Sequence, residues 1–213
     1  MTTTILLDVD GTLVDTNYHH ALAWYRAFRD NGCILPLWRL HRHMGMGGDQ
    51  LVAAVAGDDT EQRCGDPIRE AEGGHYGELI DEVSLLPGAR DLLERLSEAN
   101  WTTVLASSAK APELDHYLDL LDARHLVSAW TGAADVKATK PQPDLIHVAL
   151  EKVGASSGLL VGDSVFDCEA AARAGIDSVA LLTGGFSREE LSGAGAVEVV
   201  ASIAELSDWL FRT

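Results

Sequence analysis

Apolar and polar residues follow each other along this chain in two different rhythms. Residues 5–7 form a short apolar run near the start, which is the pattern of a buried strand. From residue 85 onward, short apolar runs alternate with stretches in which apolar residues recur every three or four positions. The runs predict strands at residues 101–106, 126–130, 159–161 and 179–182. The last of these completes the alternation of strands and helices, so no further strand is expected after it. The stretches predict helices at residues 89–96, 114–121, 146–153, 166–174 and 203–210.

The segment from Val14 to Ser84 shows helical spacing alone, without a strand pattern. Strands that alternate with helices over short links form a parallel sheet with helices on both faces. A helical insertion after the first strand would lie over the carboxyl ends of the strands, where open α/β sheets bind ligands. The sequence therefore predicts an α/β fold: a Rossmann-like doubly wound parallel sheet core, residues 1–13 and 85–213, with an inserted all-helical cap domain, residues 14–84.

The net charge of the chain indicates which classes of partner it does not bind. The 213 residues include 33 acidic and 16 basic side chains, and the formal net charge is −17. Phosphate backbones and anionic membranes bind clustered lysine and arginine, so we expect no nucleic-acid and no membrane partner. No apolar run is long enough to span a membrane, and the sequence shows neither a signal peptide nor a paired cysteine pattern. We therefore expect a cytoplasmic protein. We also expect it to be a monomer or a weak homodimer.

Candidate chemistry begins directly after the first predicted strand, at Asp8-Val9-Asp10-Gly11-Thr12. Residues two apart on a strand share a face, so Asp8 and Asp10 would point the same way. Two carboxylates held that close repel each other unless a cation or a proton compensates them, and Mg²⁺ prefers such oxygen ligands. The alternative is an ordinary turn, since Asp, Gly and Thr are common where a strand ends.

Unusual residues also follow the other predicted strands. Ser107 and Ser108 follow the second strand, Lys140 follows the third, and Gly162-Asp163-Ser164 with Asp167 follows the fourth. Because parallel strands end at the same edge of the sheet, these groups would converge with Asp8 and Asp10.

These four motifs, in this order, resemble those of the haloacid dehalogenase superfamily. The resemblance spans the whole chain and is greatest to its phosphoglycolate phosphatase and β-phosphoglucomutase-like group, whose members carry a helical (C1) cap. It implies a phosphoric monoester hydrolase, dependent on Mg²⁺, that acts on a small phosphorylated metabolite. In this chain the catalytic residues would be Asp8, Asp10, Ser107 and Lys140.

The resemblance also implies a role for each residue. Asp8 would attack phosphorus and form an aspartyl phosphate, while Asp10 would protonate the leaving alcohol and then activate water. Lys140 and Ser107 would stabilise the phosphoryl oxygens. The metal residues would be Asp8, Asp10 through its main-chain oxygen, Asp163, and Asp167 as a support that orients the metal's waters. The substrate-binding residues would be Gly11, Thr12, His20 and Ser108, where His20 resembles a histidine that helps couple cap closure to catalysis.

Several alternatives remain open at this point. Asp163 could cap a helix, Lys140 could lie in solvent, Ser107 could be a turn residue, and an error of one position would exchange Ser107 for Ser108. A β-phosphoglucomutase-like phosphotransferase is disfavoured because Met44 and Gly48 stand where such mutases carry a lysine and an arginine, and Gly162 where they carry an acidic residue. A haloacid dehalogenase has no acid at the position of Asp10. A non-catalytic ligand-binding relative stays possible, and the sequence does not reveal the natural substrate.

Overall fold

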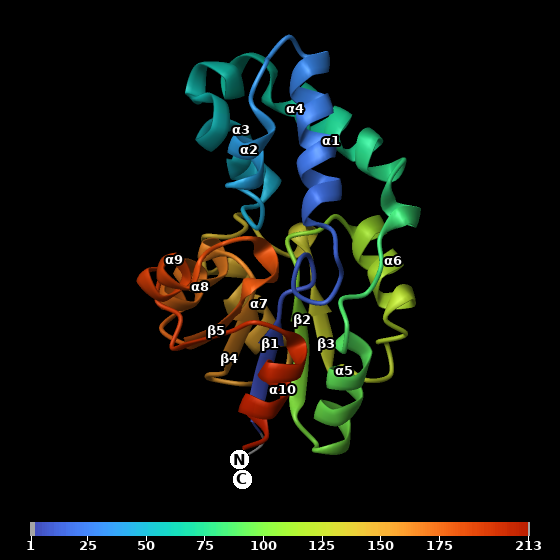
Figure 1. Ribbon diagram of the computed structural model, residues 1–213, viewed down its shortest axis with the longest axis vertical. Coiled ribbons are helices and arrows are strands. Elements are labelled where there is room, and N and C mark those ends of the chain that lie inside the picture. The colour runs from blue at the N-terminus through green and yellow to red at the C-terminus, as the bar shows by residue number, and fades with distance from the viewer. Residues whose placement is uncertain (1–2, 213) are drawn as a thin grey trace.

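A six-stranded sheet forms the centre of the computed structural model, which describes residues 3–212 (Figure 1). Every pair of neighbouring strands is parallel, in the order β3-β2-β1-β4-β5-β6. The strands are β1 (Thr4–Leu7), β2 (Thr102–Ala106), β3 (Ala129–Thr131), β4 (Leu159–Gly162), β5 (Asp177–Leu181) and β6 (Glu198–Val200). The first strand lies in the middle of the sheet, so its carboxyl end lies at the centre of the ligand-binding edge.

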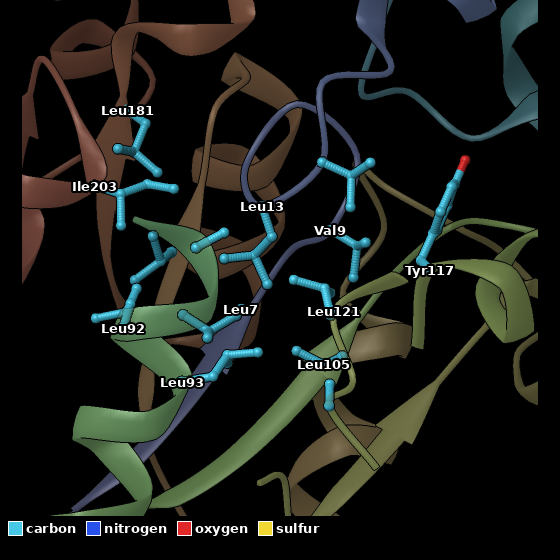
Figure 2. Close-up of a cluster of buried hydrophobic side chains, with 14 of the residues drawn as sticks. Leu7, Val9, Leu13, Leu92, Leu93, Leu105, Tyr117, Leu121, Leu181 and Ile203 are labelled. Atoms are coloured by element: carbon cyan, nitrogen blue, oxygen red, sulfur yellow. The ribbon is translucent and has the colours of Figure 1, made fainter. Parts of the chain in front are cut away.

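Helices cover both faces of this sheet, because alternate residues of the central strands point to opposite sides. Ile5 and Leu7 face a cluster that includes Leu92 and Leu93 of one helix and Ile203 of another, part of which Figure 2 shows. Leu6 faces the opposite cluster, which contains side chains of two further helices. The first cluster involves α5 (Ala89–Glu98), α6 (Ala111–Leu120) and α10 (Ile203–Leu210), and the second involves α7 (Asp144–Lys152) and α8 (Val165–Ala174).

The predicted α/β fold with a parallel, doubly wound sheet is thus confirmed. Two details of the prediction were wrong. The chain adds α9 (Arg188–Gly193) and an edge strand, β6, after the strand expected to complete the alternation. The strand expected at residues 126–130 begins only at Ala129. Both strands are three residues long, and so short an apolar run carries little periodic signal.

The segment between β1 and α5 is helical and stands above the carboxyl ends of the strands (Figure 1). We call its four helices the cap and the remaining elements the core. The cap helices are α1 (Asn17–Asp30), α2 (Leu37–His41), α3 (Gly48–Ala56) and α4 (Asp58–Gly77), and 3-10 turns lie at Ile80–Glu82, Ala133–Asp135 and Leu182–Gly184.

The cap has a hydrophobic cluster of its own, centred on Trp24, Phe28, Leu51 and Ile68. This cluster satisfies the apolar stripe that the spacing of Trp24 and Phe28 predicts for α1. The chain enters and leaves the cap side by side, since Val14 pairs antiparallel with Leu85. Among residues 3–212, no helix combines the length and the apolar character that crossing a membrane requires.

Candidate active site

Three carboxylates meet at the carboxyl ends of the two central strands. Asp8 follows β1, Asp163 follows β4, and Asp167 lies in the first turn of α8. All three residues are buried, and one carboxylate oxygen from each lies within 4.8 Å of the others. The backbone of Asp8 is fixed by the neighbouring strand, because its N–H donates to the Val161 carbonyl at 2.9 Å.

Lys140 supplies the one positive charge in direct contact with this cluster in the part of the chain that the structure describes. Its side chain is 2% exposed, and its Nζ lies 2.5 Å from Oδ1 of Asp8 and 2.7 Å from Oδ1 of Asp167. Burial lowers the pKa of Lys140, but the charges of Asp167 and Asp8 outweigh this effect and raise that pKa above its ordinary value. The ammonium group therefore stays charged and holds the two carboxylates in place.

One ammonium group does not balance three carboxylates. Burial raises the pKa of Asp8 well above its ordinary value, and burial together with the charge of Asp167 raises the pKa of Asp163 to about 7. A buried cluster of oxygen donors with excess negative charge has the chemistry that a hard divalent cation requires. Asp8, Asp163 and Asp167 therefore fit a divalent metal ion.

Residues of the first loop hold Asp163 from the opposite side. Thr12 Oγ1 donates to Oδ1 of Asp163 at 3.1 Å, and Asn17 Nδ2 donates to Oδ2 at 2.8 Å. Gly11 has φ +76°, and a Cβ there would lie 2.1 Å from Asp163 and from Asn17. The loop thus requires glycine for both its conformation and its space. Thr12 therefore supports the Asp163 carboxylate and Gly11 leaves room for it, while the expected contacts of Gly11 and Thr12 with substrate stay a prediction. Sequence reasoning missed Asn17.

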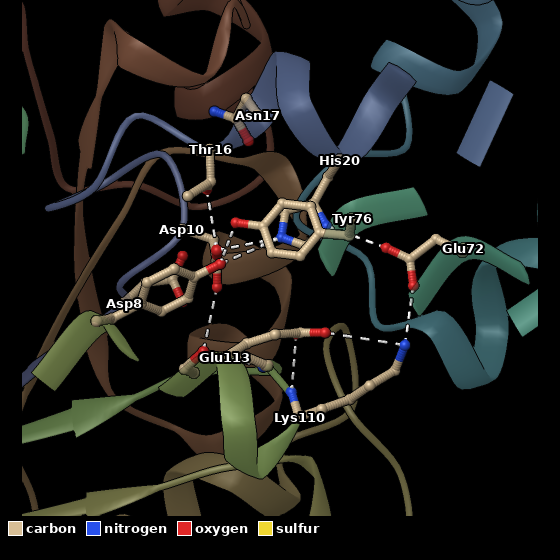
Figure 3. Close-up of polar contacts among 12 residues, drawn as sticks. Asp8, Asp10, Thr16, Asn17, His20, Glu72, Tyr76, Lys110 and Glu113 are labelled. Carbon is tan, nitrogen blue, oxygen red and sulfur yellow. Dashed lines mark hydrogen bonds and ion pairs between the residues drawn. The ribbon is translucent and has the colours of Figure 1, made fainter. Parts of the chain in front are cut away.

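The carboxylate of Asp10 lies apart from the three-carboxylate cluster and faces Thr16 and His20 (Figure 3). Thr16 Oγ1 donates to it at 2.9 Å and Ser107 Oγ at 3.2 Å, while His20 Nε2 lies 3.4 Å away. Burial raises the pKa of Asp10, but the contacts with His20 and Thr16 outweigh burial and lower it. The structure thus separates the two aspartates of the first motif by environment. The role of the Asp10 main-chain oxygen as a metal ligand stays a prediction.

His20 connects Asp10 to residues that sequence reasoning did not find. Its Nδ1 lies 3.1 Å from Oε1 of Glu72, and Lys110 Nζ donates to Oε2 of the same carboxylate at 2.9 Å. The imidazole stacks on Tyr76 with ring centroids 3.7 Å apart. Burial lowers the pKa of His20, but its contacts with Asp10 and Glu72 raise it to about 10. The chain of contacts runs from the core at Asp10 through the cap and back to the core at Lys110 (Figure 3).

The two serines after β2 differ in their contacts. Ser107 Oγ donates to Asp10 and accepts from the Ala109 N–H at 2.9 Å, so its hydrogen-bonding capacity is in use within the protein. Ser108 lines the pocket, and its buried Oγ has no hydrogen-bond partner among the described residues. Ser108 therefore offers the free hydroxyl of the pair, whereas the expected contact of Ser107 with a phosphoryl oxygen stays a prediction.

A pocket of about 230 Å³ lies between cap and core and is lined by Asp8, Asp10, His20, Ser108 and Lys140 together with cap side chains. The cap touches the loop that carries Lys140. Gly47 N–H donates to the Lys140 carbonyl at 3.0 Å, and Asp49 accepts from Thr139 N–H at 3.1 Å. The cap therefore lies closed on the core. Of the residues expected to contact a phosphate ester, Asp8, Asp10, His20, Ser108 and Lys140 line the pocket, and Gly11, Thr12 and Ser107 are outside its lining.

Comparisons with known proteins show the family and the fold of the chain. Residues 5–181 match the family model described as haloacid dehalogenase-like hydrolase. The chain is 31% identical over 190 residues to a phosphoglycolate phosphatase of Aliivibrio fischeri, covering 84% of each chain. It is similar to the crystal structure of a hydrolase from Pseudomonas syringae, with a TM-score of 0.92, 31% identity and 98% of each chain covered. It also shares the fold of a putative β-phosphoglucomutase from Bacteroides vulgatus, with a TM-score of 0.87, 23% identity, and 98% of this chain and 88% of that chain covered.

Proposed function

Because the chain belongs to the haloacid dehalogenase-like hydrolases, we propose that it is a Mg²⁺-dependent phosphatase that hydrolyses a small phosphorylated metabolite through an aspartyl phosphate. One observation carries the proposal. A buried carboxylate held by Lys140 and a second carboxylate held by Thr16, Ser107 and His20 line the same pocket. Two carboxylates in different environments suit a nucleophile and an acid–base group.

The first step of the proposed reaction is attack by Asp8 on phosphorus. Its carboxylate oxygen forms the bond to phosphorus while the bond to the alcohol oxygen breaks, and that oxygen takes a proton from Asp10, to which the His20 imidazolium, 3.4 Å away, supplies it. In the second step Asp10 takes a proton from water as the water oxygen attacks phosphorus and releases Asp8. Lys140 remains beside Asp8 throughout and offsets the charge that builds up on the phosphoryl oxygens.

Asp8, Asp163 and Asp167 supply the oxygen donors expected for Mg²⁺, which when bound would neutralise charge on the phosphoryl group. Ser108 provides a free hydroxyl to a phosphoryl oxygen, and cap residues form part of the pocket wall above the reacting groups.

Asp10 also separates this proposal from its rivals. A dehalogenase needs no proton for a departing halide, so a carboxylate kept in place by Thr16, Ser107 and His20 would serve no purpose there. A phosphotransferase must hold a phosphorylated sugar in two orientations, and the cap loop presents Met44 and Gly48 rather than basic side chains to the pocket. A purely ligand-binding role does not require the ordered Asp10 network.

The test is phosphate release from a panel of phosphate esters, with and without Mg²⁺. We expect release that depends on Mg²⁺, and quenched reactions should contain phosphate bound to the protein through Asp8. In a single turnover, Asp10→Asn should slow esters with poor leaving groups more than activated aryl phosphates, because only the former need the proton. Equal slowing of both classes would remove the acid role from Asp10, and no release from any ester would remove the phosphatase proposal.

A further inference from the structure

Besides the residues assigned to the reaction, the pocket has a further wall, which we call the chamber wall. Much of this wall is apolar, from the side chains of Trp24, Met44, Met46, Ala109, Ala133 and Val136. The wall also contains charged side chains, and a charged group that is already in an ion pair binds a further ion less strongly.

Apart from His20 and Lys140, which contact Asp10 and Asp8, the pocket lining contains three cations, and the guanidinium group of one of them, Arg69, is already paired. It donates to Glu61 through Nη1 at 3.0 Å and Nη2 at 2.6 Å, and to Asp66 at 2.8 Å. A bidentate contact of this kind is the geometry with which arginine binds an anion. Neither Glu61 nor Asp66 lines the pocket, so both neutralise Arg69 from behind.

Lys110 is the second cation, and it is paired as well. Its Nζ donates to Glu72 at 2.9 Å and lies 3.9 Å from Glu113, and both of these carboxyl groups line the pocket beside it. The third cation, Lys137, lies exposed at the pocket wall. Asp49 also lines the pocket and accepts a hydrogen bond from the Thr139 N–H. With His20, which pairs with Glu72, four cations stand against five carboxyl groups, Asp49, Glu61, Asp66, Glu72 and Glu113, of which Glu61 and Asp66 lie outside the pocket lining.

We propose that this chamber selects monophosphate esters of an uncharged alcohol and rejects esters whose alcohol carries a second anionic group. The inference rests on the proposed phosphatase function and adds its substrate class. A second carboxylate or phosphate would find Arg69 and Lys110 already paired, and the wall cation without an ion pair among the described residues is the exposed Lys137, whose charge water screens. It would therefore gain little attraction and would meet the carboxyl groups of Asp49, Glu72 and Glu113. An uncharged alcohol would instead contact apolar side chains and lose no ion pair.

The test compares two pairs of esters of matched size. Ethylene glycol monophosphate and 2-phosphoglycolate form one pair, and glycerol 3-phosphate and 3-phosphoglycerate form the other. We expect kcat/KM at least about tenfold higher for the uncharged member of each pair, and the same ordering among all other esters in the panel that are hydrolysed. Equal values, or turnover confined to esters with a second anion, would overturn the inference while leaving the phosphatase proposal intact. No hydrolysis of any ester would instead remove the phosphatase proposal.

A substitution behind the chamber wall tests the role of Arg69. Glu61→Gln removes the bidentate charge partner and leaves the pocket lining unchanged. We expect the preference for the uncharged ester to fall by about fivefold or more, because the guanidinium group can then bind a second anion. Asp66→Asn, which removes the exposed partner, should shift the preference in the same direction by less.

Glu70→Gln is the matched control, because it changes the net charge equally at an exposed position of the same helix without an ion-pair contact to Arg69. We expect it to leave the preference unchanged. If Glu61→Gln and Glu70→Gln shift the preference equally, the shift is an effect of net charge, and the argument from the pairing of Arg69 is overturned. A preference unaffected by both Glu61→Gln and Asp66→Asn would overturn it too.

Discussion

Glu72 lies where cap and core meet, and we expect Glu72→Gln to lower the free energy of unfolding by about 2–4 kcal/mol near pH 6. The side chain is 4% exposed and its two oxygens face two cationic groups, His20 at 3.1 Å and Lys110 at 2.9 Å. A buried hydrogen bond to a charged group contributes about 1.5–3 kcal/mol. The pair with Lys110, whose side chain is 48% exposed, adds at most about 1 kcal/mol because water screens it. Glutamine keeps the shape but turns an N–H donor toward one of the two donors.

The dependence of this loss on pH distinguishes a charge effect from a packing effect. Burial raises the pKa of Glu72, but the contacts with His20 and Lys110 outweigh it, so the pKa in the folded protein lies below the ordinary 4.5. A carboxylate with a lowered pKa contributes stability that is present above pH 4.5 and is lost as the pH falls through the folded pKa. The difference between wild type and Glu72→Gln should therefore be equal at about pH 6 and pH 5 and smaller at about pH 3.5.

Urea unfolding at each pH, followed by tryptophan fluorescence, measures these differences. Lys110→Met is the control, because it removes the half-exposed partner alone and should cost less than about 1 kcal/mol. The reasoning would be refuted if Lys110→Met cost as much as Glu72→Gln, or if the loss in Glu72→Gln did not change at low pH.

Three further outcomes follow from the site. Asp8→Asn should reduce turnover by at least about 10⁴-fold with the circular dichroism spectrum unchanged, since the amide lacks the nucleophilic oxygen; turnover near the wild-type rate would disprove the covalent mechanism. Chelation of divalent metal should stop turnover, with rescue by Mg²⁺ and not by Ca²⁺, which prefers higher coordination; full activity in chelator would refute the metal assignment. Burial raises the pKa of Glu113, so its contribution to stability is full below pH 4.5 and declines as the pH rises through the folded pKa. Glu113→Gln, which can still accept the Lys110 N–H, should therefore gain stability relative to wild type between about pH 4 and pH 8, and a difference independent of pH would contradict this.

The sequence predicted that Asp8, Lys140 and Asp163 would lie close together, because each follows a strand of a parallel sheet, whose strand ends meet at one edge. Asp8 and Asp163 follow their strands directly, whereas Lys140 lies nine residues after β3. The position of Glu72 between His20 and Lys110 depends instead on contacts between elements far apart in the chain. Glu72 is 52 residues from His20 and 38 from Lys110, and it lies in a polar stretch of α4 that reads as a solvent-facing helix.

Similar limits explain the other omissions. Asn17 is the first residue of α1, and only the position of Asp163, 146 residues later, shows that its amide has a partner. Ser107 and Ser108 differ in which hydroxyl is free, which depends on the orientation of Asp10 and not on residue type. The edge strand β6 is only three residues long, which is too short to show a periodic pattern in the sequence. Its pairing with β5 identifies it as a strand, and that pairing is visible only in the structure.

The central position of β1 also affects the order in which the protein can form during translation. β1 pairs with β2, which begins at Thr102, and with β4, which begins at Leu159. At about 5–20 residues per second, a ribosome needs roughly 5–20 seconds to synthesise the chain between the first strand and its first partner. The cap helices are complete within that interval, and their contacts are local. The cap can therefore pack while the apolar strand that will become the middle of the sheet is still unpaired. That strand is the segment of the nascent chain most in need of protection from aggregation.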